Sequence, residues 1–278
     1  MSNPVHTAFV LGGGGVLGAS EVGMLQALHE HGIRADLVVG TSIGAINGAL
    51  HAAHPQDSAT LARLWQSMAG SAVFGRGAAQ RIRHVARTQI ALHGNEALRA
   101  LLDSQLRGRT FADLAIPFEC CAASIERAAE HWFDEGPLVD AILASSAVPG
   151  LFPPVQIGGE HFLDGGLVNS IPIGRAIQRG AQQVFVLQVG RVERPLSPPT
   201  RPWDVATVSF EIARRHRFAR DLAEVPDGVN VHVLPSGDAE TPLASVRYRS
   251  TAAVPRRIEQ ARQATADFLA ALADEPRD

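Results

Sequence analysis

The sequence contains no lysine, because all 25 of its basic residues are arginine. A Walker-type phosphate loop, a protein kinase, a pyridoxal-phosphate enzyme and a Ser–Lys hydrolase each need a lysine that binds phosphate or reacts. These four classes are excluded. The net formal charge of −3 and the pI of about 6.4 give no strong positive field, so no nucleic-acid partner is expected.

Cysteine is scarce as well: the chain has two, Cys120 and Cys121, and they are neighbours. Neighbouring residues of an extended strand point to opposite faces, so a disulfide between these two is disfavoured. The sequence shows no Cys and His spacing typical of a zinc site. We expect neither a metal nor a cofactor.

Long apolar runs are missing too. No run reaches the roughly 18 residues of a membrane-spanning helix, and residues 1–6 do not resemble a signal peptide. We therefore expect a soluble, cytoplasmic protein that can make peripheral contact with a membrane, and the alternative is an external location. The 278 residues, 46% of them hydrophobic, suffice for a substantial core. A single domain over residues 1–278 is the economical interpretation, and its oligomeric state is left open.

The first part of the chain alternates apolar strands with helices. The predicted order is strand, helix, strand, helix, over Thr7–Leu11, Ala19–His29, Leu37–Val39 and Ala45–Ala53. This rhythm favours an α/β fold with a mostly parallel central sheet and helices on both faces.

The later elements continue the pattern. Strands are predicted over Pro117–Ile125, Glu130–Asp134, His161–Leu163, Val184–Val189 and Val229–Leu234. Helices are predicted within Ser58–Ala112 and over Pro137–Ala144 and Arg256–Leu272. Residues 191–202 hold four prolines and predict a loop. The Arg-rich segment Arg214–Arg220 is interpreted as a solvated helix face, the alternative being contact with an anionic lipid surface.

The strongest local motif is Gly40-Thr41-Ser42-Ile43-Gly44, between a strand and a helix. A nucleophilic serine needs an exposed hydroxyl in a strained strand-to-helix turn, and small residues such as Gly40 and Gly44 let neighbouring backbones approach. The helix N-terminus behind Ser42 favours developing negative charge. We interpret Ser42 as a nucleophile, and the alternative is a purely structural turn.

A glycine-rich turn, Gly12–Gly18, joins the first strand to the first helix. Gly13, Gly15 and Gly18 fit the G-x-G-x-x-G fingerprint of dinucleotide binding, but that fingerprint needs an acidic residue at the end of the second strand. Asp36 lies at its start, and the serine turn occupies its end. The other interpretations are a flexible loop and an oxyanion hole, in which consecutive glycines turn amides toward one point. We favour the oxyanion hole because it makes use of the serine.

The serine also needs a base, and none of the 11 histidines has a clear triad context. His216 and His232 come late enough for the Ser, Asp, His order of an α/β-hydrolase and define a rival mechanism. The better candidate is Asp164, which follows an apolar strand and precedes Gly165 and Gly166. Alone, an Asp-Gly-Gly sequence is usually only a turn. Four other histidines are expected to be surface or capping residues: His29, His31, His51 and His54.

These motifs, in this order, resemble those of the patatin-like phospholipase family. That family has a glycine-rich oxyanion loop, a G-x-S-x-G elbow and a D-G-G/A motif. Ala144–Pro154 and Asn169–Pro172 are similar to the family's segments before and after the aspartate. The likeness runs from about Ala8 to Val189, which leaves residues 203–274 as a C-terminal extension of helices and a strand.

The resemblance implies a three-layer α/β/α fold and a Ser–Asp dyad, with Ser42 as the nucleophile and Asp164 as its base. It also implies an oxyanion hole formed by Gly13, Gly14 and Gly15. The supporting glycines of the motifs are Gly12, Gly18, Gly40, Gly44, Gly165 and Gly166. Leu17 departs from the family, since many relatives carry arginine or lysine there. Its presence weakens the case for a phospholipid headgroup without touching the dyad.

The function implied by the resemblance is a serine lipid-acyl hydrolase of the phospholipase A or lysophospholipase type, acting through an acyl-enzyme. One alternative is a carboxylesterase for other esters, and a second is a His-dependent α/β-hydrolase or acyltransferase. A third is a catalytically silent binding protein that keeps the scaffold. The expected partner is a lipid or a small ester.

Overall fold

The computed structural model describes residues 5–69, 91, 94–189, 195–200, 202–237 and 253–274. The strands are β1 (Thr7–Leu11), β2 (Leu37–Thr41), β3 (Phe118–Ser124), β4 (Ala129–Phe133), β5 (Val155–Ile157), β6 (Glu160–Asp164), β7 (Gln183–Leu187) and β8 (Asn230–Val233). The α-helices are α1 (Ala19–Glu30), α2 (Ile43–Ala53), α3 (Ser58–Ala69), α5 (Glu96–Leu106), α6 (Leu138–Ser145), α7 (Ile173–Gln178), α8 (Pro202–Ala223) and α9 (Ala253–Asp274). Short 3-10 helices are η1 (Gly15–Gly18), η3 (Phe111–Asp113) and η4 (Gly165–Leu167).

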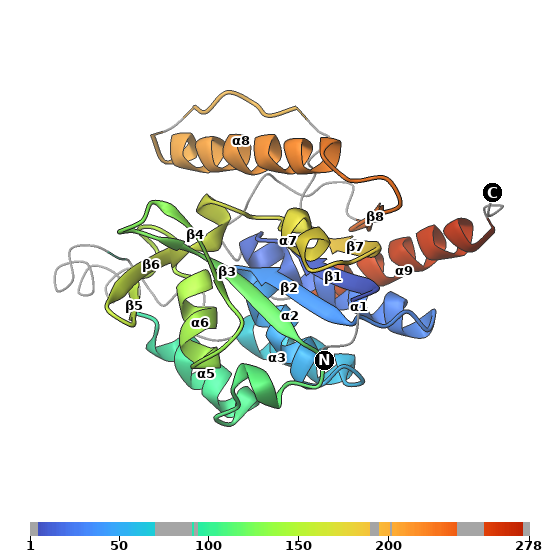
Figure 1. Ribbon diagram of the computed structural model, residues 1–278, viewed down its shortest axis with the longest axis horizontal. Coiled ribbons are helices and arrows are strands. Elements are labelled where there is room, and N and C mark those ends of the chain that lie inside the picture. Colours follow the sequence, from blue (N-terminus) through green and yellow to red (C-terminus); the bar gives the residue numbers. More distant parts are fainter. Residues whose placement is uncertain are drawn as a thin grey trace.

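The described strands form one sheet in the order β5-β6-β3-β2-β1-β7-β8, with β4 also paired to β3. The pairings from β3 through β2, β1 and β7 to β8 are parallel. The pairings of β4, β5 and β6 are antiparallel. The predicted α/β fold with a mostly parallel central sheet is confirmed (Figure 1).

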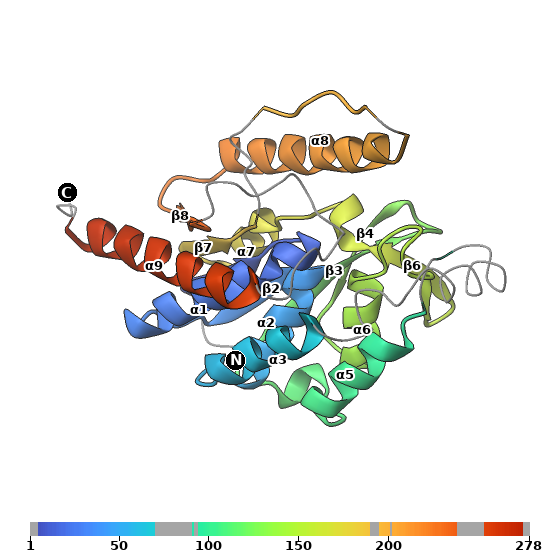
Figure 2. The ribbon, with the colours of Figure 1, turned by 180° about the vertical axis from the view of Figure 1, so that it is seen from behind.

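Helices cover both faces of this sheet (Figures 1 and 2). Along β1, Phe9 and Leu11 belong to the core that α1, α2 and α9 close. Ala8 and Val10 belong to the opposite core, toward α7 and Phe218 of α8. Successive strand residues point to opposite faces, so the alternation supplies each layer with apolar side chains. Strands buried on both faces read as continuous apolar runs, as the sequence of β1 does.

Along one edge of β3 the paired strand changes from β2 to β6, and this change positions the site. On the edge of β3 opposite β4, Thr41 of β2 pairs with Cys121, and Asp164 of β6 pairs with the next residue, Ala122. β2 runs parallel to β3 and β6 runs antiparallel to it. The C-terminal ends of β2 and β6 therefore meet head to head along one edge of β3.

The C-terminal helix α9 packs along α1 (Figure 2). The two helices approach closely at Gly23, because a Cβ at this position would lie 2.0 Å from the carbonyl oxygen of Ile258. Direct backbone contact thus joins the C-terminal extension to the motif-bearing part of the chain. In the part of the chain that the structure describes, no helix combines the length and apolar character needed to cross a bilayer.

Most of the predicted elements are confirmed with bounds shifted by a few residues. Three elements were not predicted as such: β5, α7 and the full extent of α8. β5 and α7 are too short to show a hydrophobic period. The predicted helical stretch Ser58–Ala112 contains α3 and α5, and residues 70–90 of it lie outside the described residues. Residues 195–200 of the predicted proline-rich loop form neither helix nor strand.

Candidate active site

The side chains of Ser42 and Asp164 are in direct contact. Ser42 Oγ donates a hydrogen bond of 2.5 Å to Asp164 Oδ2, and Asp164 Oδ1 accepts one of 2.7 Å from the amide of Gly166. Both residues are buried. The structure therefore brings together the two side chains that the sequence predicts to react, although 122 positions separate them.

Ser42 lies in a strained turn between β2 and α2. Its backbone angles, φ 56° and ψ −123°, fall where residues other than glycine are rare. The amide of Ser42 donates to Ser145 Oγ over 3.0 Å, and its carbonyl accepts from Ser146 Oγ over 3.2 Å. These contacts hold a conformation that costs about 1–3 kcal/mol. Ser42 is also the N-cap of α2, so it lies at the positive end of that helix dipole.

The turn requires glycine on both sides of the serine. A Cβ on Gly44 would lie 2.2 Å from the carbonyl oxygen of Leu11, and a Cβ on Gly40 would lie 2.5 Å from the carbonyl oxygen of Gly44. The obstructing atoms are backbone atoms and cannot move aside. The start of α2 is thus pressed against the end of β1, where the glycine-rich turn begins. The other supporting glycines also lie close to neighbouring atoms: Gly12, Gly18, Gly165 and Gly166.

Asp164 is buried at the end of β6, and this burial raises the pKa of its carboxyl to about 6. The hydrogen bonds from Ser42 and from the amide of Gly166 act in the opposite direction and lower the pKa. The backbone amide of Asp164 donates to the carbonyl of Ala147 over 2.9 Å. A carboxylate with a pKa near 6 is ionised at neutral pH and is a stronger base than an exposed one.

The glycine-rich turn lies beside Ser42. A Cβ on Gly13 would lie 3.5 Å from Ser42 Cβ. The amide of Gly13, one of the three predicted oxyanion donors, donates to the carbonyl of Ser170 over 2.8 Å. The amides of Gly14 and Gly15 donate to no backbone carbonyl of the described residues. Val189 packs directly against Gly14, since a Cβ on Gly14 would overlap Cγ2 of Val189.

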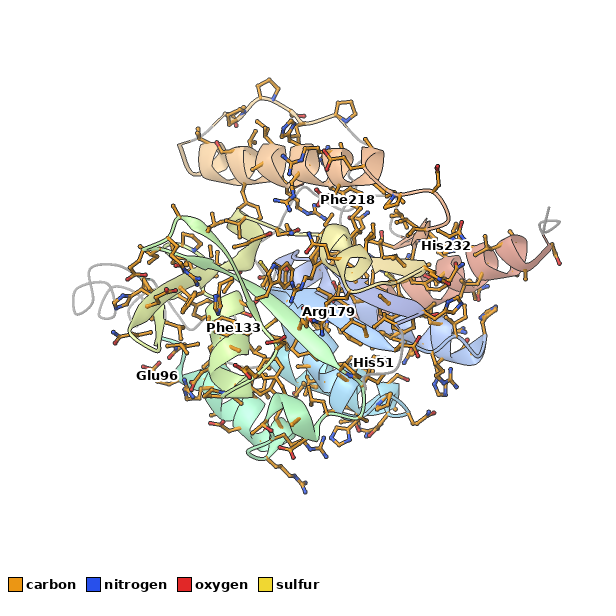
Figure 3. All side chains as sticks on the ribbon, in the orientation of Figure 1. His51, Glu96, Phe133, Arg179, Phe218 and His232 are labelled. Atoms are coloured by element: carbon orange, nitrogen blue, oxygen red, sulfur yellow. The ribbon has the colours of Figure 1, made fainter. Side chains whose placement is uncertain are left out.

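Neither rival histidine is hydrogen-bonded to Ser42 within the described residues. His232 Nε2 lies 3.0 Å from Gln183 Oε1, and its ring stacks on Phe185 at the β8 edge of the sheet (Figure 3). His216 lies on the exposed side of α8. His51 differs from its prediction as a surface or capping residue, because it is buried and stacks on Phe9. This burial lowers the pKa of His51 to about 4.

Arg214 corrects the interpretation of the Arg-rich segment as a solvated face. Its guanidinium is buried and donates to the carbonyl of Val189 over 2.8 Å and to Gln188 Oε1 over 3.0 Å. It also pairs with Glu211 one turn earlier. Arg220, in contrast, has 55% of its side chain exposed. The helical spacing of Glu211, Arg214 and Phe218 is the signal that could have shown an inward face.

Sequence reasoning also assigned no role to Ser145 and Ser146, which hold the backbone of Ser42, or to Ala147, which holds that of Asp164. These three residues lie in the segment Ala144–Pro154, whose sequence indicates only a resemblance to the family. Their small size and their place directly after a predicted helix were visible in the sequence. Their contacts, about a hundred positions away for the serines, were not.

The fold and the site together define an α/β protein with a serine at a strand-to-helix elbow and a buried carboxylate as its partner. The model of the family described as patatin-like phospholipase matches residues 9–177 of the chain. The chain belongs to this family, which confirms the resemblance seen in its motifs.

Individual relatives agree with this placement. The chain is 32% identical over 186 residues to the patatin-like phospholipase domain-containing protein ZK370.4 of Caenorhabditis elegans. It is also 32% identical over 186 residues to the lysophospholipase NTE1 of Kluyveromyces lactis. Each match covers 66% of this chain but only 14% and 12% of the respective relative. The chain therefore spans a small part of the length of these proteins.

Solved structures similar to this chain include two bacterial proteins. VipD from Legionella pneumophila has a TM-score of 0.49 and 15% identity, with 97% of this chain and 68% of that chain covered. ExoU from Pseudomonas aeruginosa, solved with SpcU, has a TM-score of 0.49 and 15% identity, with 99% and 54% covered.

Proposed function

We propose that the protein is a serine lipid-acyl hydrolase that cleaves carboxylic esters of phospholipids or lysophospholipids. Ser42 is the nucleophile and Asp164 is the base. The observation that carries this proposal is the 2.5 Å contact between Ser42 Oγ and a buried carboxylate at a strained elbow. Membership of the patatin-like phospholipase family and the lysophospholipase name of one relative support a lipid ester as the substrate.

Acylation begins with proton transfer. As Ser42 Oγ bonds to the carbonyl carbon of the ester, its proton passes to Asp164 Oδ2 and the carbonyl π electrons move to oxygen. The tetrahedral intermediate collapses when the bond to the alcohol oxygen breaks. The proton on Asp164 passes to that oxygen, so the alcohol leaves neutral and the acyl group remains on Ser42.

Deacylation repeats these steps with water. Asp164, ionised again, accepts a proton from the water that attacks the acyl carbon. The bond between that carbon and Ser42 Oγ then breaks, and the proton returns to Oγ. The fatty acid leaves and the hydrogen bond between Ser42 and Asp164 forms again.

In both halves the developing negative oxygen needs donors. The amides of Gly14 and Gly15 fit this role because no backbone carbonyl of the described residues accepts from them. Donors already fixed in place need no reorganisation as charge develops, and removing one typically costs about 2.7–4 kcal/mol of transition-state stabilisation. We assign the oxyanion hole to Gly14 and Gly15, and leave Gly13 out because its amide is used.

We place contact with the lipid surface on the outer face of α8 and on η4. In the described part of the chain, five large apolar side chains are exposed: Ile125, Leu167, Val205, Ile212 and Leu222. Three of these belong to α8. Leu167 belongs to η4, which directly follows Asp164 and contacts α8. Exposed apolar side chains on an element beside a site suit contact with apolar ligands or interfaces.

The test is a substrate panel run on wild type and variants. Wild type should release fatty acid from p-nitrophenyl esters and from a phospholipid or lysophospholipid, and Ser42→Ala should abolish this activity. His216→Ala and His232→Ala serve as matched controls and should stay active. A folded wild type that turns over no ester and resists a fluorophosphonate probe would support the silent scaffold. Loss of activity in either histidine variant would support the rival mechanism.

A further inference from the structure

Ser170 has a buried hydroxyl without a partner. The residue lies between η4 and α7 and is 2% exposed. Within the described residues its Oγ has no hydrogen-bond partner. Unpaired buried polar atoms are few in native proteins because each costs folding free energy, so each calls for an explanation.

The position of this hydroxyl relates it to the nucleophile. A Cβ built on Gly13 would lie 3.0 Å from Ser170 Oγ and 3.5 Å from Ser42 Cβ. Ser170 Oγ and Ser42 Cβ therefore both lie beside the position that a side chain at residue 13 would occupy. Because residue 13 is glycine, it places no side chain between the hydroxyl of Ser170 and Ser42.

The other hydroxyls around the elbow already have partners. Thr41 Oγ1 donates to the carbonyl of Asn169 over 2.8 Å. Ser145 Oγ accepts from the amide of Ser42, and Ser146 Oγ donates to the carbonyl of Ser42. Among the described residues near the elbow, the hydroxyl of Ser170 differs from these three because it has no hydrogen-bond partner at all.

The backbone of Ser170 explains why the amide of Gly13 does not serve as a donor. The carbonyl of Ser170 accepts that amide over 2.8 Å, so Gly13 is tied to the same residue whose side chain is unpaired. The carbonyl of Ser170 thus occupies the amide of Gly13, which was a predicted donor, and the hydroxyl of Ser170 is a second donor at the same place.

We propose that Ser170 is a further catalytic residue, whose hydroxyl donates a hydrogen bond to the carbonyl oxygen of the ester attacked by Ser42. The inference rests on the proposed function. The hydroxyl keeps its proton throughout, and its hydrogen bond strengthens as the carbonyl oxygen becomes negative. Ser170 then complements the amides of Gly14 and Gly15, and its hydroxyl gains a partner when substrate binds.

The direct test is Ser170→Ala. Removal of one donor should lower kcat/KM for a p-nitrophenyl ester about 100- to 1000-fold, mainly through kcat. Tm should stay equal or rise, because the substitution deletes a buried hydroxyl without a partner. Ser170→Thr keeps a hydroxyl and should retain more activity than Ser170→Ala.

Ser124→Ala is the matched control. Ser124 is also a buried serine, but it lies in β3 and its Oγ donates to Glu160 Oε2 over 3.2 Å. This variant should lower Tm and leave kcat unchanged, the reverse of Ser170→Ala. The acid limb of the pH profile should be the same in Ser170→Ala and wild type, since the Asp164 carboxylate accepts its hydrogen bonds from Ser42 and Gly166 and not from Ser170.

A Ser170→Ala enzyme with wild-type kcat/KM would overturn the inference, as would a loss of activity that merely follows a loss of Tm. The proposed function fails separately. If hydrolysis by wild type is absent, or persists in Ser42→Ala, the function is wrong. If hydrolysis depends on Ser42 and not on Ser170, only the role of Ser170 is wrong.

Discussion

The Asp164 carboxylate meets two opposing demands. Burial raises its pKa to about 6, and this makes it a better base toward a serine hydroxyl than a carboxylate in water. The same burial disfavours its charged form and thus costs stability in the folded state. The hydrogen bonds from Ser42 and Gly166 limit that cost without removing it.

The first prediction concerns the pH dependence of turnover. Only ionised Asp164 can accept the proton of Ser42, so kcat/KM should fall as the pH drops through about 6. The measurement is the rate against pH with an ester that does not titrate in this range, with Tm recorded to show that the enzyme stays folded. An acid limb near the ordinary Asp value of about 4 would contradict a buried base.

The second prediction is that Asp164→Asn abolishes activity and at the same time stabilises the protein. The folded-state pKa of Asp164 lies above its unfolded value, so folded wild type gains stability as the pH falls through about 6. Above that pH the ionised group costs at most about 3 kcal/mol, and the neutral amide avoids this cost. Thermal unfolding should give Asp164→Asn the higher Tm in mildly alkaline buffer, with a smaller gap in mildly acidic buffer. A variant less stable than wild type at every pH would refute the argument.

Among single residues, those that lie close to glycines in the sequence could be predicted as candidate catalytic residues. Ser42 and Asp164 each have glycines within two positions that signal a tight turn, so both could be found without coordinates. The sequence could not show that the amide of Gly13 is hydrogen-bonded or that the hydroxyl of Ser170 has no partner. Both facts depend on how residues far apart in the chain pack together.

At the scale of elements, the strands and helices with clear apolar periods were predictable. The exchange of partners along β3 was not, since it depends on the register of three strands at once. Both cores also need the packing of α1, α7, α8 and α9 around the sheet, and pairings of this kind leave little trace in any one segment.

The third prediction tests the contact between α2 and β1. In Gly44→Ala the added methyl carbon would lie 2.2 Å from the carbonyl oxygen of Leu11, so the helix must shift. We expect a loss of about 3 kcal/mol in the free energy of unfolding, measured with urea, and a large fall in kcat because Ser42 moves with the helix.

Gly174→Ala is the control for this substitution. Gly174 lies in α7, and a Cβ there would come no closer than 3.8 Å to Asp221 Oδ2. Alanine in a helix with room for its methyl group should be neutral or stabilise by about 0.5–1 kcal/mol. Equal effects of the two variants on stability would show that the contact at Gly44 does not matter.

At the scale of the whole molecule, α8 shows an unusual distribution of polarity. Its buried side carries Glu211, Arg214 and Asp221 together with Phe218, which points toward the sheet (Figure 3). Its outer side exposes large apolar residues, among them Ile212. Surface helices ordinarily bury their apolar face, so this reversed arrangement suits an element whose outer side meets a lipid surface.

The fourth prediction follows from that surface. Ile212 is 56% exposed, and Ile212→Asp should weaken sedimentation with phospholipid vesicles and slow hydrolysis of vesicle lipid. Hydrolysis of a short soluble ester should not change, because the substitution leaves the dyad intact. Ile125→Asp is the control, since Ile125 is 46% exposed but lies outside α8 and η4. Equal vesicle binding by both variants would rule out this surface.

The head-to-head meeting of β2 and β6 along β3 has a consequence for how catalytic competence is regained after denaturation. Local folding alone cannot bring Ser42 and Asp164 together, because β2 and β6 meet only through β3, which lies far from both in the chain. Non-local pairings of this kind form late and slowly. Recovery of turnover during refolding should therefore lag behind recovery of the far-ultraviolet dichroism signal of the helices.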